Sequence, residues 1–130
     1  MLINDYQKGM VEGRNFNCAE KLVNLGNESL NLQLPPQAVK MAAGFGAGMG
    51  KQHLCGAVAG AVMILSVVKV KTIARESDIY VCCSEMLDEI ENRLGSIICK
   101  ELKASFYNKE LKCKYIIDNV VEVLAESLEA

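Results

Sequence analysis

The sequence predicts an all-α protein, a single domain (residues 1–130) folded as a compact bundle of five to six helices around a central apolar helix at about residues 54–69. Apolar side chains recur at helical spacing through most of the chain, and no segment shows the strict alternation of a strand. With 130 residues, 51% of them hydrophobic, the chain can bury a core without needing disulfides or a metal to stay folded.

Three helices are expected in the first third of the chain. Residues 2–13 carry Leu2, Tyr6 and Met10 at helical spacing, and a glycine can end this helix at residue 13. A second helix should begin after Asn17, whose side chain can form a capping box with Glu20. A third starts with proline in its first turn, where a missing N–H does no harm, and ends at a glycine-rich stretch.

The central helix is apolar on nearly all sides, so other helices should surround it. Its apolar run is shorter than the roughly 17–25 residues needed to cross a bilayer, which argues against membrane insertion. Gly56 and Gly60 stand one turn apart and give it a smooth face for another backbone.

The second half of the chain should form three more helices. The first covers about residues 72–94, with Gly95 as its C-terminal stop. A short helix through residue 102 would follow Ser96 as N-cap, and the last helix covers about residues 111–128.

Four of the six cysteines fall at or beside the start of a predicted helix and on its apolar side: Cys18, Cys55, Cys99 and Cys113. Unpaired N–H groups and the positive end of the helix dipole stabilise a thiolate there and lower its pKa. One buried cysteine alone is more often a small core residue, but four at helix starts predict a shared site. Cys82 and Cys83 lie mid-helix and are assigned to core packing.

Residues 44–60 form a glycine-rich stretch that contains Cys55. Its backbone can fold tightly against the helix start and turn N–H groups toward sulfur or a cofactor, and the candidate positions for this are Gly46, Gly48, Gly50 and Gly56. His53 and Lys51 could add positive charge near Cys55, and the role of His53 stays open.

Several function classes are excluded by inspection. A net charge of −2 with no basic block and only 5% aromatic residues argues against nucleic acid as a partner. Neither a phosphate-binding loop nor a dinucleotide fingerprint has its required spacing, and no C-x-x-C pair is present. The N-terminus lacks the pattern of a secretory signal, so a cytoplasmic location and reduced thiols are expected.

Taken together, "FNCAEKL", "GFGAGMG" with "CGAVAG", "LGSIIC" and the "KC" before the last helix resemble the redox-active proteins known by the pattern C_GCAxxG_C_C. The resemblance runs from about residue 17 to 113 and implies that Cys18, Cys55, Cys99 and Cys113 are the four family cysteines. Some members of this family are fused to haem-bearing segments, which implies electron transfer and an iron–sulfur centre as one option. Cys82 and Cys83 match no part of the family pattern.

Three functions therefore stay open. The first is thiol–disulfide redox chemistry with an unknown partner protein, as in an oxidoreductase, with Cys99 and Cys113 the pair nearest in sequence. The second is a metal centre, an iron–sulfur cluster or another metal held by the same four cysteines. The third is a helical interaction module with inert cysteines, and a homodimer is compatible with each of them.

Overall fold

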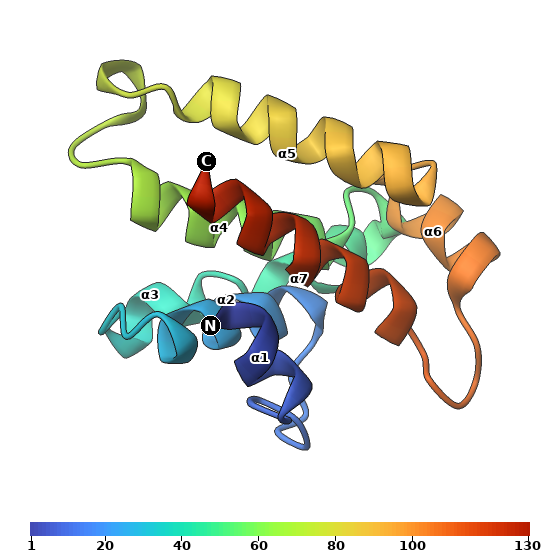
Figure 1. The fold of residues 1–130 in the computed structure, drawn as a ribbon. Coiled ribbons are helices and arrows are strands. Elements are labelled where there is room, and N and C mark those ends of the chain that lie inside the picture. The colour runs from blue at the N-terminus through green and yellow to red at the C-terminus, as the bar shows by residue number, and fades with distance from the viewer.

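The computed structural model describes residues 1–130 and shows an all-α bundle, as the sequence predicts (Figure 1). It contains no β-sheet, only two isolated antiparallel bridges. No helix combines the length and apolar character that spanning a membrane requires. The seven α-helices are α1 (Leu2–Gln7), α2 (Cys18–Ser29), α3 (Pro36–Lys40), α4 (Gly56–Lys69), α5 (Ile79–Leu94), α6 (Cys99–Phe106) and α7 (Lys114–Glu129).

Helix α4 is the centre of the bundle, which confirms the prediction for this segment. It packs against α2 on one side and against α5 and α7 on the other, and α1 lies against α7 and α2 (Figure 1). Most of its residues are buried, and fully buried side chains of the core include Leu22, Ile64, Ile90 and Leu124 from four different helices. Burial of this apolar surface is the main free-energy gain that holds the helices together.

The close approach of α2 to α4 depends on two glycines. A Cβ atom at Gly60 would lie 2.7 Å from the carbonyl oxygen of Ala19 and 2.7 Å from Cβ of Leu22. A Cβ at Gly26 would lie 2.6 Å from the side chain of Ile64. The small-residue face predicted on α4 is therefore occupied by α2 of the same chain.

The helix starts predicted from periodicity need correction at three places. Helix α5 begins at Ile79 instead of residue 72, because residues 74–76 form a separate 3-10 turn. Helix α6 begins at Cys99 with Ile98 as N-cap, and the Ser96 hydroxyl accepts a bond from the Ile98 N–H (2.9 Å) in the turn before it. Helix α7 begins at Lys114, since the residues before it form a tight loop closed by the Asn108–Lys112 bridge.

At the N-terminus, α1 ends at Gln7 instead of continuing to residue 13. Gly9 (φ +94°) and Val11 (φ +66°) both adopt left-handed backbone conformations, which a helix cannot continue through. Other predicted ends are confirmed: Gly95 (φ +83°) terminates α5, and Asn17 and Glu20 form the capping box of α2.

Candidate functional site

Four helix starts meet at one cavity of about 450 Å³, and each carries a cysteine. Cys18 and Cys99 are the first residues of α2 and α6, while Cys55 and Cys113 are the N-cap residues of α4 and α7. Every pair among these four thiols is close enough to interact electrostatically. All six cysteines of the chain are free thiols in the structure.

Cys55 and Cys99 are held beside each other by the bridge between Leu54 and Ile98. The Cys55 N–H donates to the Ile97 carbonyl (2.8 Å), and the Cys99 N–H donates to the His53 carbonyl (2.6 Å). This register makes the two cysteines diagonal neighbours, which in a regular antiparallel pair lie about 7–8 Å apart.

Cys18 is positioned by the capping box that precedes it. The Asn17 Oδ1 accepts from the Glu20 N–H (2.9 Å), the Glu20 Oε1 accepts from the Asn17 N–H (2.9 Å), and Asn17 Nδ2 also donates to the Ala43 carbonyl (2.9 Å). These bonds stabilise the first turn of α2 and attach it to Ala43, which directly precedes the glycine run.

Cys113 is positioned by a loop with its own hydrogen bonds. The Asn108 side chain accepts from the N–H groups of Glu110 (3.0 Å) and Leu111 (2.6 Å), and the Lys112 N–H donates to the Asn108 carbonyl (2.7 Å). Lys112 adopts a left-handed conformation (φ +54°), which turns the chain into α7 directly at Cys113.

The thiols of Cys18 and Cys113 lie close enough for a hydrogen bond between them, although the two residues stand far apart in the sequence. The bond from Cys18, assisted by the charge of Lys103, lowers the pKa of Cys113 to about 6. The same bond, together with burial, raises the pKa of Cys18. At neutral pH Cys113 is therefore a thiolate that accepts a hydrogen bond from the Cys18 thiol.

The expectation that all four helix starts would lower a cysteine pKa is wrong for Cys18, Cys55 and Cys99. Burial raises the pKa of the Cys55 thiol, and the N–H groups of Val58 and Ala57 oppose it only in part. Burial also raises the pKa of Cys99 despite the nearby Lys103. For Cys55 and Cys99, the free-energy cost of removing a thiolate from water exceeds the stabilisation that the helix N-terminus provides.

The glycine run meets the site at one of the four predicted positions. Gly56 lines the cavity, whereas Gly46, Gly48 and Gly50 do not. A Cβ at Gly48 (φ +59°) would lie 2.5 Å from the His53 nitrogen and 2.9 Å from Cβ of Cys99, and one at Gly46 would lie 2.3 Å from Asn17 Nδ2. These two glycines allow the backbone to pack closely against Asn17 and Cys99.

The remaining candidates lie outside the cavity. Neither His53 nor Lys51 lines it, and His53 contributes through its backbone carbonyl. The Cys82 thiol donates to Asp78 (3.6 Å), the N-cap residue of α5, and Cys83 lines a separate apolar groove. Both cysteines are partly buried against the core, in keeping with the packing role assigned to them, and neither lines the four-cysteine cavity.

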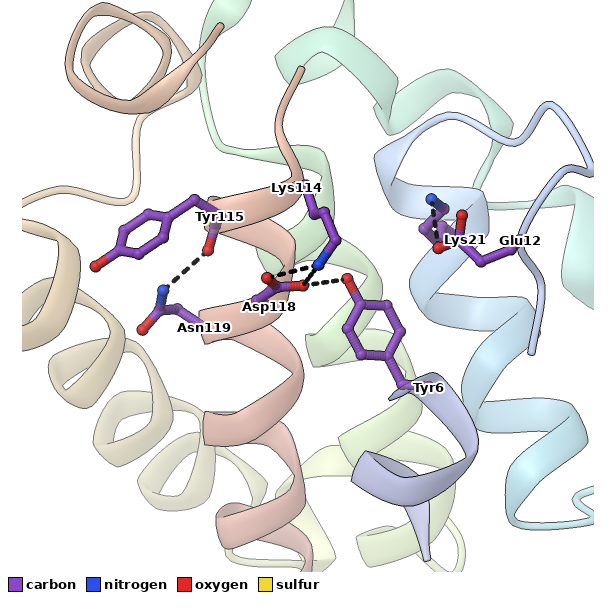
Figure 2. A network of polar contacts seen from close by, with 7 residues as sticks. All are labelled: Tyr6, Glu12, Lys21, Lys114, Tyr115, Asp118 and Asn119. Atoms are coloured by element: carbon purple, nitrogen blue, oxygen red, sulfur yellow. Dashed lines mark hydrogen bonds and ion pairs between the residues drawn. The ribbon is translucent and has the colours of Figure 1, made fainter. Parts of the chain in front are cut away.

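Sequence analysis missed the charged residues around the cavity. Its lining includes four lysines and two glutamates: Lys21, Lys103, Lys112, Lys114, Glu12 and Glu110. Figure 2 shows two of these lysines in ion pairs: Lys114 with Asp118 (3.0 Å) and Lys21 with Glu12 (3.6 Å). A signal was present in the spacing, because Lys21, Lys103 and Lys114 each follow a site cysteine within about one helical turn.

Tyr6 connects α1 to the start of α7 at the edge of the cavity. Its hydroxyl donates to Asp118 (2.5 Å), which also accepts from Lys114, as Figure 2 shows. Burial and the Asp118 carboxylate raise the pKa of Tyr6, which therefore stays protonated and remains a donor. This network fixes the N-terminal segment against the helix that follows Cys113.

The donor chemistry of the cavity suits a soft metal centre, since four thiols line it and no histidine does. As they lie, however, no three His, Cys, Asp or Glu side chains are grouped to hold a single metal ion. The cavity therefore supplies thiol ligands of the type that a soft metal centre uses, without a set placed around one ion.

Fold and site together define an all-α protein with four cysteines at helix starts around one cavity. Residues 16–127 match the family model described as "Putative redox-active protein (C_GCAxxG_C_C)", so the chain belongs to this family. A relative from Archaeoglobus fulgidus, described as an "Uncharacterized protein", is 27% identical over 128 residues that cover 87% of this chain and 85% of the relative. No solved structure matches the chain.

Proposed function

We propose that this member of the redox-active family is a dithiol–disulfide redox protein whose active pair is Cys18 and Cys113. The observation that carries the proposal is that these two thiols lie close together at one cavity, where their interaction makes Cys113 the better thiolate. Both side chains are partly exposed, whereas Cys55 and Cys99 are buried. A reacting thiol must be ionised and reachable, and Cys113 meets both conditions best.

The reaction follows from this arrangement. The Cys113 thiolate attacks one sulfur of a partner disulfide, forms a mixed disulfide and releases the partner's other sulfur as a thiolate, which takes up a proton. Cys18 then loses its proton and attacks the Cys113 sulfur, which forms the Cys18–Cys113 disulfide and releases the second partner thiol. Two electrons pass from the protein to the partner, and a reductant of the same chemical class reverses the sequence.

In this proposal Cys55 and Cys99 are the buried neighbours of the reacting pair. Their high pKa values keep them protonated, so they add no negative charge beside the Cys113 thiolate. Chemistry of this kind needs a reducing compartment to regenerate the dithiol, which is the ground for placing the protein in the cytoplasm.

The test is to treat the metal-free protein with a mild oxidant, count the thiols that are lost, and map the disulfide by peptide mass spectrometry. We expect two thiols to be lost and a Cys18–Cys113 peptide pair to appear. Cys82→Ser is the matched control, since this cysteine lies outside the cavity and its loss should leave the pair intact. A linkage between Cys99 and Cys113, or no linkage, would contradict the proposal.

A second candidate function is an iron–sulfur protein that holds its cluster with Cys18, Cys55, Cys99 and Cys113. The observation that favours it is that four thiols from four helix starts line one cavity. The cluster would supply one-electron transfer, and the buried N–H groups near Cys55 would tune it. Protein purified without oxygen would then show charge-transfer absorption and stoichiometric iron, both lost in each Cys→Ser variant of the four.

A colourless, metal-free sample that forms the Cys18–Cys113 disulfide would favour the dithiol function over the cluster. A sample that shows neither behaviour would leave the cysteines as packing residues and favour a helical interaction module, monomeric or dimeric.

A further inference from the structure

The cavity beside Cys113 carries two cations that no carboxylate neutralises. Lys21 and Lys114 are paired with Glu12 and Asp118, but Lys103 and Lys112 form no ion pair within the protein. Glu110 is the one lining carboxylate without a lysine partner. These unpaired side chains sum to one positive charge, which the Cys113 thiolate balances when it forms, so a local cation is available to the sulfur and to its reaction partner.

Lys103 is the lysine whose charge acts on the Cys113 thiol. It interacts with both Cys99 and Cys113, and it is the one lysine that does so. The ammonium group lies over the ring of Tyr107, 5.9 Å from the ring centroid, which holds the side chain at the cavity on α6. A charge in this place meets whatever approaches Cys113.

The dimensions of the site indicate what can approach. The reactive sulfurs lie in a cavity of about 450 Å³ with a mostly apolar lining, and Tyr107 and Leu111 are half-exposed at it. Cavities of about 300–1,000 Å³ are of the size that encloses small organic ligands. A disulfide on a folded protein surface would have to enter this recess to reach Cys113, whereas a small molecule can diffuse into it.

We propose that the cavity is a substrate site for small organic disulfides that carry carboxylates, and that Lys103 is the residue that selects for their negative charge. The inference rests on the proposed dithiol function and names its substrate class. The disulfide is the oxidant: one half forms the mixed disulfide with Cys113 and the other leaves as a thiolate beside Lys103. Cys18 then displaces the first half, and the two released thiols account for both electrons.

The charge of the substrate also explains why Lys103 rather than the paired lysines would matter. Lys21 and Lys114 already have carboxylate partners, so an incoming carboxylate would have to compete with Glu12 or Asp118. Lys103 is free to meet it, and its attraction acts in both the encounter and the departure of the anionic leaving group.

The experiment compares three small disulfides of similar size at one pH: dithiodipropionate, with two carboxylates; hydroxyethyl disulfide, which is neutral; and cystamine, with two ammonium groups. Each second-order rate with the reduced protein is divided by the rate of the same disulfide with a neutral thiol in solution. We expect the normalised rates to fall in the order anionic, neutral, cationic.

Variants at Lys103 test whether this residue selects for negative charge. Lys103→Gln should reduce the anionic-to-neutral ratio by about fivefold, the upper range for one solvent-exposed charge pair. Lys103→Arg should keep the ratio, and Lys100→Gln is the matched control because this exposed lysine on the same helix does not line the cavity.

Equal normalised rates, or a cationic preference, would overturn the inference while leaving the dithiol function in place. If the reduced protein reacts with none of the three disulfides, the inference is overturned as well. In that case the proposed function fails as well only if a general thiol oxidant also leaves Cys18 and Cys113 unlinked.

Discussion

The thiols of Cys18 at the start of α2 and Cys113 at the start of α7 lie close enough for a hydrogen bond, and this interaction shifts their pKa values in opposite directions. The pair is the feature of the site with the clearest chemical consequence. One sulfur is a stabilised thiolate near neutral pH, and the other holds the proton that stabilises it.

The first prediction concerns thiol reactivity against pH. Because the pKa of Cys113 is about 6, its alkylation rate should rise through pH 6 and level off before pH 8, while the other site cysteines react only at higher pH. Alkylation followed by peptide mass spectrometry measures each rate. Cys18→Ala should move the Cys113 midpoint upward, and an unchanged midpoint would show that the hydrogen bond is not its cause.

The second prediction concerns stability against pH. A lowered folded pKa at Cys113 stabilises the protein above the unfolded value of about 8.5, and this gain is lost as pH falls through about 6. The raised pKa of Cys18 acts in the opposite sense, and its contribution is lost as pH rises above about 8.5.

The free energy of unfolding contributed by the pair should therefore rise from about pH 6 toward about pH 8.5 and decline beyond it. Urea unfolding of the reduced protein across this range measures the effect. A Cys18→Ala, Cys113→Ala double variant should lack this part of the pH dependence, and an identical profile in both proteins would contradict the prediction.

The third prediction concerns the α2–α4 contact. Gly60→Ala should destabilise the protein by about 1–3 kcal/mol, because its new Cβ would meet the Ala19 carbonyl and Leu22 at 2.7 Å in a packed interface. Thermal and urea unfolding measure the loss. Gly44→Ala is the control: no atom lies within 4 Å of its added Cβ, so its stability should be close to that of the parent protein.

The fourth prediction concerns Tyr6. Tyr6→Phe removes the hydrogen bond to Asp118 and should cost about 1–2 kcal/mol, since the acceptor is charged but keeps its bond to Lys114. Denaturant unfolding measures the change, with the exposed Tyr80→Phe as the comparison. Equal effects of the two substitutions would mean that the Tyr6–Asp118 bond contributes no net stability.

The fifth prediction concerns the start of α2. Asn17→Ala removes the side-chain acceptor of the capping box and should cost about 1 kcal/mol. It should also slow formation of the Cys18–Cys113 disulfide, because Cys18 is the residue that this cap positions. Asn119→Ala is the control, since its side chain bonds only the Tyr115 carbonyl within α7 (Figure 2). If the disulfide forms in Asn17→Ala at an equal or faster rate, the cap does not position Cys18 for this reaction.

Much of this protein is local in origin, and the sequence by itself determined that part. Helical periodicity, the capping box at Asn17 and Glu20, and the left-handed stop at Gly95 act over a few neighbouring residues, so they can be recognised in a linear pattern. The same applies to the central apolar helix and to the placement of four cysteines at helix starts.

Only the tertiary structure decided which groups meet. Among the four site cysteines, Cys99 and Cys113 are the nearest in sequence and suggested a pair, but the packing of α2 and of α7 against α4 brings Cys18 to Cys113. Helix position alone suggested four activated thiolates. In the bundle, burial raises the pKa values of Cys55 and Cys99, and the interaction with Cys113 together with burial raises that of Cys18. Desolvation and side-chain contact are properties of neighbours in space, and the linear chain does not specify them.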